Sequence, residues 1–180
     1  MGFFFSNKST DVRKLRTSTT TPTVRGFKQL SLLSSASLTC ANCPLDKAPL
    51  EHPKMLPTGS DRPQIYMLGE APGEEEDLKG EQFVGKAGET LRNKISSRWA
   101  KEIRWGNIIR CRPTEIGGSS NRAPSPLEIA CCRRLQEEDI AHTKPKAVFG
   151  FGNVPLEWMI GEAGIQQWRG RRIPCNIRGH

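Results

Sequence analysis

The chain has 180 residues, 36% of them hydrophobic, and carries a formal net charge of +8 at pH 7. This length suits one domain with a single core, and no hydrophobic run approaches the roughly 20 residues that cross a membrane, so we expect a soluble protein with no membrane partner. The positive charge favours a nucleic-acid partner, because lysine and arginine contacts to phosphates release counterions.

The first 37 residues are rich in serine and threonine and contain one acidic residue, Asp11. Such a composition buries too little apolar surface to fold, so we interpret residues 1–37 as a disordered basic tail. The apolar residues at its start are too few for a secretory signal. We therefore expect a cytoplasmic protein, with organelle import as the less favoured alternative, and a folded domain at 38–180.

A buried strand is expected at 64–68, after a proline-containing loop at 46–63. Residues 67–88 then concentrate glycines and carboxylates at the end of this strand. Open α/β sheets bind ligands at the carboxyl ends of their strands, so this block is the candidate ligand loop.

Strands and helices alternate through the rest of the chain. Ser125 and Glu128 form a capping box that predicts the start of one helix. The expected elements are a helix at 87–98, a strand at 103–110, a helix from 126 to about 142, a strand at 147–152 and a helix at 153–160. This order predicts an α/β fold with a parallel sheet of three strands, and we find no fourth strand before residue 180.

The six cysteines include one pair with metal-type spacing, Cys40-x-x-Cys43. On the helix expected after residue 125, Cys131 lies in an apolar stripe with Leu127 and Leu135, which predicts a core residue. Cys132 lies about 100° further around that helix.

Four cysteines therefore remain as candidate metal ligands: Cys40, Cys43, Cys111 and Cys132. Four thiolates suit an iron–sulfur cluster or zinc, and the spacing does not separate the two. Four unrelated structural cysteines are a further alternative. A disulfide framework is disfavoured in a chain of this length that lacks a secretory signal.

Several motifs resemble, in order, those of the family 4 uracil-DNA glycosylases, the thermostable type that carries an iron–sulfur cluster. They are CANCPL at 40–45, GEAPGEEED at 69–77, FVGKAG at 83–88, GNIIRCRP at 106–113, NRAPSPLEIACC at 121–132 and RG at 169–170. The resemblance implies a three-layer sandwich around a central parallel sheet and, as activity, base flipping followed by hydrolysis of the N-glycosidic bond of uracil in DNA. It also implies a monomer that acts on single- or double-stranded DNA.

The resemblance also implies a [4Fe-4S] cluster on the four candidate cysteines, in preference to zinc. Asn107 and Cys111 are four residues apart on the expected strand, roughly 13 Å at about 3.3 Å per residue. We therefore expect the cluster to be structural and to lie away from the base.

Site roles follow from the same resemblance. Glu70 matches the catalytic carboxylate, which stabilises the cationic sugar and orients water. Phe83 matches the platform on which a flipped base stacks, and Asn107 matches the amide that reads the uracil edge. Contacts to the base or pocket are expected from Ala71, Gly73 and Glu76. Contacts to the DNA backbone are expected from Gly85, Lys86, Gly88, Arg122 and Arg169, with Arg112, Arg171 and Arg172 as further phosphate contacts.

One feature departs from the family, which continues past the RG motif into another strand and a His-Pro-Ser-type motif. This sequence lacks that motif. We therefore expect a domain without its last strand. The alternative function is a DNA-binding or accessory module of a replication or repair protein with little or no catalysis, and a structural zinc protein is a third reading.

Overall fold

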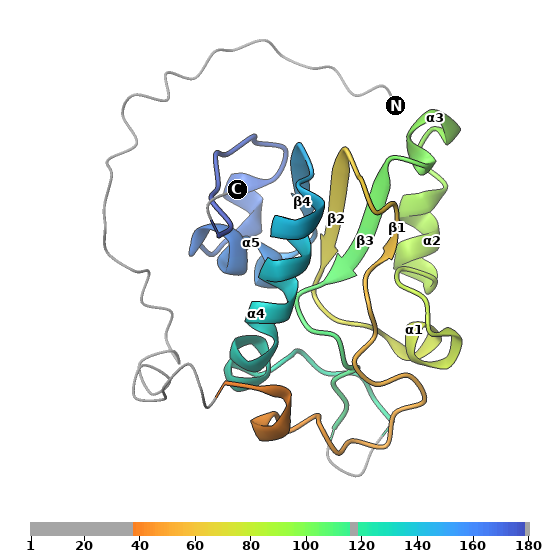
Figure 1. Ribbon diagram of the computed structural model, residues 1–180, viewed down its shortest axis with the longest axis vertical. Helices are drawn as coiled ribbons and strands as arrows, with labels where there is room; N and C mark the ends of the chain where they lie inside the picture. Colours follow the sequence, from red (N-terminus) through yellow and green to blue (C-terminus); the bar gives the residue numbers. More distant parts are fainter. Residues whose placement is uncertain (1–37, 116–118, 179–180) are drawn as a thin grey trace.

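The computed structural model describes residues 38–115 and 119–178, so the tail expected at 1–37 lies outside the described residues. Its centre is a four-stranded sheet in the order β1-β3-β2-β4 (Figure 1). The strands β2 (Ile65–Gly69), β3 (Ile103–Asn107) and β4 (Ala147–Gly150) are parallel. The three expected parallel strands are therefore confirmed.

A short strand, β1 (Thr58–Gly59), pairs antiparallel with β3 at the edge of the sheet. We expected a loop here, and that prediction is wrong. Two residues carry no readable alternation, so the pairing depends on the neighbouring strand and not on a local pattern.

Helices cover both faces of the sheet. The described helices are the 3-10 turn η4 (Cys40–Asn42), α1 (Glu74–Lys79), α2 (Lys86–Arg92), α3 (Ser97–Ala100), α4 (Pro126–Thr143), α5 (Asn153–Ile160) and α6 (Ile165–Trp168). Figure 1 shows α4 and α5 on one side of the strands and α2 on the other. None of the helices within 38–115 and 119–178 has the length and apolar character to cross a membrane.

Two cores result, because neighbouring side chains of a strand point to opposite faces. Tyr66 of β2 belongs to a buried cluster that includes Ile140 of α4. The next residue, Met67, belongs to a second cluster with Trp105 of β3, against which Leu91 of α2 packs. The three-layer α/β architecture is thus confirmed.

The capping box at the start of α4 is confirmed. The Ser125 hydroxyl accepts a hydrogen bond from the Glu128 N–H, and the Glu128 carboxylate accepts one from the Ser125 N–H at 2.7 Å. However, Leu127 and Leu135 are only half-buried, while Glu128 and Gln136 are buried. Of the expected apolar stripe, only Cys131 lies on the buried face. Polar residues occupy that face because other elements supply partners, such as Tyr66 for Gln136.

Two expected elements end early. The helix expected at 87–98 stops at Arg92, and α3 begins separately after an extended Ser96. The strand expected at 103–110 stops at Asn107, and residues 108–111 bend. The extended-strand distance assumed between Asn107 and Cys111 therefore does not apply to this segment.

Candidate functional site

The carboxyl ends of β2 and β3 bring three predicted site residues together. Gly69 is directly paired with Asn107 in the parallel ladder. A Cβ added to Gly69 would overlap the Asn107 amide and lie 2.8 Å from the tip of the Phe83 ring. The amide and the ring therefore meet over the bare Cα of Gly69, and Glu70 follows next in the chain.

The Asn107 side chain is buried and hydrogen-bonded. It is 5% exposed, and its Nδ2 donates to Oε1 of Gln82 at 2.5 Å. Gln82 is 1% exposed, and its Nε2 donates to the carbonyl oxygen of Leu56 at 3.3 Å. Sequence reasoning missed Gln82, although it directly precedes Phe83 in the motif that we singled out.

Phe83 is held in a backbone conformation that non-glycine residues rarely adopt, with φ of 58°. Its ring lies 5.2 Å from the Trp105 ring and 6.2 Å from the Phe151 ring, measured between centroids. Arg92 donates from Nε to the Phe83 carbonyl at 3.1 Å and also donates to the Gln82 carbonyl at 2.8 Å. No motif pointed to this guanidinium, which fixes the loop that carries the ring.

Glu76 joins two loops of the candidate site. Its carboxylate accepts hydrogen bonds from the N–H of Gly73 at 3.0 Å and the N–H of Gly85 at 2.9 Å. Ala71 packs partly buried against the core on the α4 side. The loop before α1 is therefore tied to the loop before α2 by a carboxylate that sequence analysis assigned to the pocket wall.

Glu70 is half-buried, and within the described part of the chain its carboxylate has no hydrogen bond or ion pair. Burial raises the pKa of this carboxyl above its ordinary value, because leaving water disfavours the charged form. The group is thus available to a ligand and ionises at a higher pH than an ordinary glutamate.

The residues expected to contact DNA differ in whether other groups already bind their side chains. Lys86 is exposed at the start of α2, and exposed Arg169 donates to Gln166 at 3.4 Å. Arg122 instead donates to both oxygens of the Glu128 carboxylate, at 2.6 and 2.9 Å. A phosphate at Arg122 would have to share that guanidinium with Glu128.

Close packing also occupies Gly88, where an added Cβ would overlap the Phe83 backbone. The approach that Gly88 permits here is therefore between α2 and the Phe83 loop.

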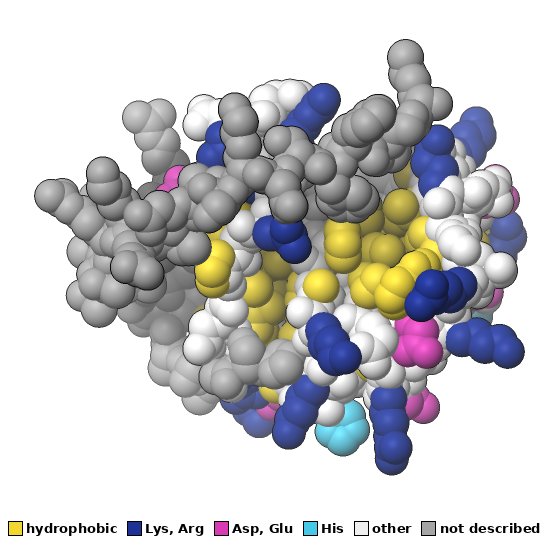
Figure 2. Space-filling model, turned by 90° about the horizontal axis from the view of Figure 1, so that it is seen from above, with side chains coloured by type: hydrophobic (Ala, Val, Ile, Leu, Met, Phe, Trp, Pro, Cys, Tyr) yellow, Lys and Arg dark blue, Asp and Glu magenta, His cyan; other side chains and the backbone are white. Residues whose placement is uncertain are grey.

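Lysine and arginine side chains also surround a group of hydrophobic side chains on the face seen from above (Figure 2). Positive charge is therefore not confined to one end of the sheet.

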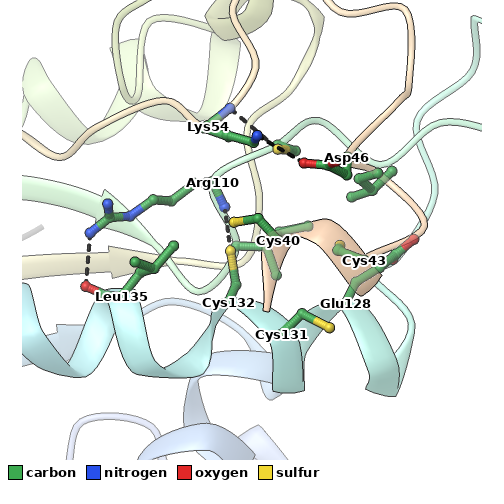
Figure 3. Close-up of a pocket in the computed structure, with 12 residues that line it drawn as sticks. Cys40, Cys43, Asp46, Lys54, Arg110, Glu128, Cys131, Cys132 and Leu135 are labelled. Atoms are coloured by element: carbon green, nitrogen blue, oxygen red, sulfur yellow. Dashed lines mark hydrogen bonds and ion pairs between the residues drawn. The ribbon is translucent and has the colours of Figure 1, made fainter. Parts of the chain in front are cut away.

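A second region gathers the cysteines. Figure 3 shows a pocket between η4, the segment after β3 and α4. Its thiols come from Cys40, Cys43, Cys111, Cys131 and Cys132. All four candidate ligands thus line one pocket, brought there from three separate elements.

Cys131 lines the same pocket, which sequence analysis did not foresee. It is buried, as expected of a core residue, but it lies against the pocket together with Cys43. The pocket lies against the part of α4 that Cys131 and Cys132 share, so neighbouring helix positions both reach it.

Two properties of the thiols bear on whether they could hold a metal group: burial opposes it and backbone donors favour it. Burial raises the pKa of Cys131 to about 11 and that of Cys132 to about 12. Backbone N–H groups donate to two of the sulfurs, from Lys54 to Cys111 at 3.3 Å and from Arg110 to Cys132 at 3.4 Å. Such bonds stabilise sulfur ligands of a metal centre. Among the described residues, however, no three His, Cys, Asp or Glu side chains form a set arranged for a metal ion.

Comparisons with known proteins identify the family. The family model of the uracil DNA glycosylase superfamily matches residues 56–175. The type-4 uracil-DNA glycosylase of Archaeoglobus fulgidus is 29% identical over 125 residues, which are 68% of this chain and 59% of the relative. That of Thermotoga maritima is 28% identical over 148 residues, or 80% of this chain and 73% of the relative. The chain therefore spans about three fifths of the first of these relatives.

Proposed function

The chain belongs to the uracil DNA glycosylase superfamily, and from this premise we propose that it hydrolyses the N-glycosidic bond of uracil in DNA and leaves an abasic site. One observation carries the proposal. The Asn107 amide and the Phe83 ring meet over Gly69, beside a half-buried Glu70 whose carboxylate has no partner among the described residues. This is a place for a flat, hydrogen-bonding ring next to a negative charge.

In this proposal the base leaves the DNA stack and lies against Phe83, since an enzyme cannot reach the bond within the duplex. Uracil offers one donor and one acceptor on the edge that Asn107 reads, and a carboxamide can pair with both. Trp105 and Phe151 support the Phe83 ring from the sides, so it does not have to become ordered on binding.

Glu70 stabilises the positive charge that develops on the sugar and orients the attacking water in this proposal. Both roles need the ionised form. The raised pKa of Glu70 follows from the burial that brings the carboxylate close to a bound ring, so activity falls when acid protonates it.

Contacts with the nucleic acid belong to the same proposal. We assign the phosphates to exposed cations, Lys86 and Arg169 first, because nothing buried competes for them. Arg122 ranks below them, since its guanidinium already donates to the Glu128 carboxylate and to the carbonyls of Thr114 and Ala123. The N–H groups near Ala71 contact the base or a phosphate, while the N–H of Gly73 is already bonded to Glu76.

We also propose a [4Fe-4S] cluster on the pocket thiols, with zinc as the alternative. The proposed ligands are Cys40, Cys43, Cys111 and Cys132. Support comes from the gathering of these thiols, the N–H donors to two sulfurs and the similarity to type-4 enzymes. When bound, the group would link η4, the segment after β3 and α4. Anaerobic purification followed by iron and sulfide analysis tests it, and colourless, zinc-containing protein would contradict it.

The decisive experiment uses a labelled oligonucleotide with one uracil, incubated with the protein and then treated with alkali. We expect a break at the uracil and none in the matched oligonucleotide with thymine. Binding without any break would favour the alternative, a DNA-binding or accessory module. We further propose that the protein is a cytoplasmic monomer. Size-exclusion chromatography of the purified protein tests its oligomeric state.

A further inference from the structure

We propose that Gln82 is a positioning residue that fixes which way the Asn107 amide faces and thereby makes the site select uracil over cytosine. This inference rests on the proposed role of Asn107 as the reader of the base. Gln82 is only 1% exposed, so a base that enters from solvent cannot contact its side chain. Gln82 would therefore act only through Asn107.

The argument starts at a backbone carbonyl. Leu56 presents its carbonyl oxygen to the Gln82 side chain, and a carbonyl oxygen can only accept a hydrogen bond. The Gln82 amide must therefore turn its Nε2 toward Leu56. The opposite atom, Oε1, then faces Asn107.

The same logic sets the next amide. Oε1 of Gln82 can only accept, and Asn107 donates to it from Nδ2 at 2.5 Å. If the Asn107 amide turned over, its Oδ1 would face Oε1 and two acceptors would oppose each other. Both side chains are nearly inaccessible to water, so no solvent donor relieves that arrangement. One backbone carbonyl thus determines two side-chain orientations in sequence.

The backbone of Gln82 is held as firmly as its side chain. Arg92 donates to the Gln82 carbonyl at 2.8 Å and to the neighbouring Phe83 carbonyl at 3.1 Å. The guanidinium carbon of Arg92 also lies 4.4 Å from the centroid of the Trp105 ring. Gln82 therefore cannot follow a rotating Asn107 by shifting its main chain.

The orientation matters because uracil and cytosine present opposite patterns. Uracil offers an N–H donor at N3 and an acceptor at O4, whereas cytosine offers an acceptor at N3 and an amino donor at N4. An asparagine amide that has turned over exchanges its own donor and acceptor and so matches cytosine in place of uracil. With Nδ2 held by Gln82, Asn107 keeps Oδ1 and its second Nδ2 hydrogen in one fixed arrangement for the base.

Two substitutions separate positioning from packing. Gln82→Glu, which burial keeps protonated, can still donate to the Leu56 carbonyl and accept from Asn107, while Gln82→Leu keeps the volume but removes both polar atoms. A role in packing alone predicts that leucine is tolerated better than glutamate at this buried position. A positioning role predicts the reverse order for base selection.

The measurement is kcat/KM for a single-stranded oligonucleotide with one uracil, together with the rate of cytosine release at saturating enzyme. We expect Gln82→Leu to lower kcat/KM for uracil about tenfold, the scale of one lost hydrogen bond, and to raise cytosine release above that of the unmodified protein. Gln82→Glu should keep the ratio of the two rates. An unchanged ratio in Gln82→Leu, or a ratio lost equally in both variants, would overturn the proposal.

Gln136→Leu is the matched control, because Gln136 is also a buried glutamine but bonds to Tyr66 on the other face of the sheet. It should lower the melting temperature without changing the ratio. If Gln82→Leu does not fold, Gln82→Met takes its place as the variant without an acceptor.

A second readout keeps this inference separate from the proposed function. In NMR spectra of the full chain, one side-chain Nδ2 proton of Asn107 should exchange slowly with water, and Gln82→Leu should abolish that protection. If the unmodified protein releases no uracil, the proposed function fails and this exchange still decides whether Gln82 holds Asn107. Fast exchange in the unmodified protein would overturn the positioning role itself.

Discussion

The base site and the cysteine pocket lie on different parts of the same fold and differ in which groups hold their side chains in place. At the base site, Asn107, Gln82 and Arg92 satisfy one another through hydrogen bonds at 2.5 to 2.8 Å. In the pocket, burial raises the pKa of Cys132, so the charged form that binds metals is disfavoured in the protein alone. The first region is therefore organised by its own residues, whereas in our proposal the second is completed by a bound group.

Replacing Glu70 should give the largest effect, and it should impair the base site without changing the cysteine pocket. We expect Glu70→Gln to lower kcat for uracil release by about 100-fold or more, because it removes the charge next to the sugar. Iron content and the visible absorption of the protein should not change. Glu75→Gln is the control, since exposed Glu75 pairs with Lys79 on α1. Equal rates in the two variants would remove Glu70 from the mechanism.

Replacing one pocket thiol should instead change the iron content of the protein. We expect Cys132→Ser to lose most of the iron and to lower the melting temperature, because it removes a ligand that links α4 to η4 and to the segment after β3. The matched variant Cys131→Ser should keep its iron, although both thiols line the pocket. Iron analysis and thermal unfolding measure both. Iron lost only from Cys131→Ser would show that the ligand assignment on α4 is wrong by one position.

Arg92→Met tests whether the base site is held by its own hydrogen bonds. The change removes donors to the Phe83 and Gln82 carbonyls, so we expect a several-fold rise in KM for the uracil oligonucleotide. Arg98→Met is the control, because Arg98 is exposed on the short helix α3. Metal content should be the same in both variants. A normal KM in Arg92→Met would show that the Phe83 loop needs no such support.

The smallest expected effect concerns pH and stability. Because burial raises the pKa of Glu70 in the folded state, the folded protein holds this proton more tightly than the unfolded chain does. The stability that this provides is complete below the ordinary pKa and is lost as the pH rises through the raised one. Glu70→Gln should therefore melt at a slightly higher temperature than the unmodified protein at neutral pH, and the gap should close in acid. A gap that widens in acid would contradict the raised pKa.

Local signals in the sequence were enough for much of the fold. The capping box at Ser125 placed the start of α4, and hydrophobic runs placed β2 and β4 close to their observed bounds. Neither β1 nor the buried face of α4 could be predicted in this way. Both depend on partners that are distant in sequence, as Gln136 depends on Tyr66.

The candidate site divides in the same manner. Motifs brought Glu70, Phe83 and Asn107 to notice, and the structure places them at one end of the sheet. Gln82 and Arg92 escaped notice, since their importance lies in contacts with main-chain carbonyls that no sequence pattern records. Helical periodicity indicates which side of α4 carries Cys131, so it predicted a core residue. It does not indicate which residues pack against that side, and so it did not reveal that Cys131 lines the pocket.

Gly69 is constrained by volume, and this has a consequence for compensatory substitutions. Its backbone is ordinary, but an added methyl group would collide with Asn107 and Phe83. Gly152 shows the opposite case, with φ of 101° and nothing within 4 Å of an added Cβ in the described structure. Smaller residues at both 107 and 83 should thus restore the folding of Gly69→Ala but not its activity, whereas no neighbouring change should relieve Gly152→Ala. In a library of random variants, position 69 should therefore change only together with its neighbours, and position 152 should change alone or not at all.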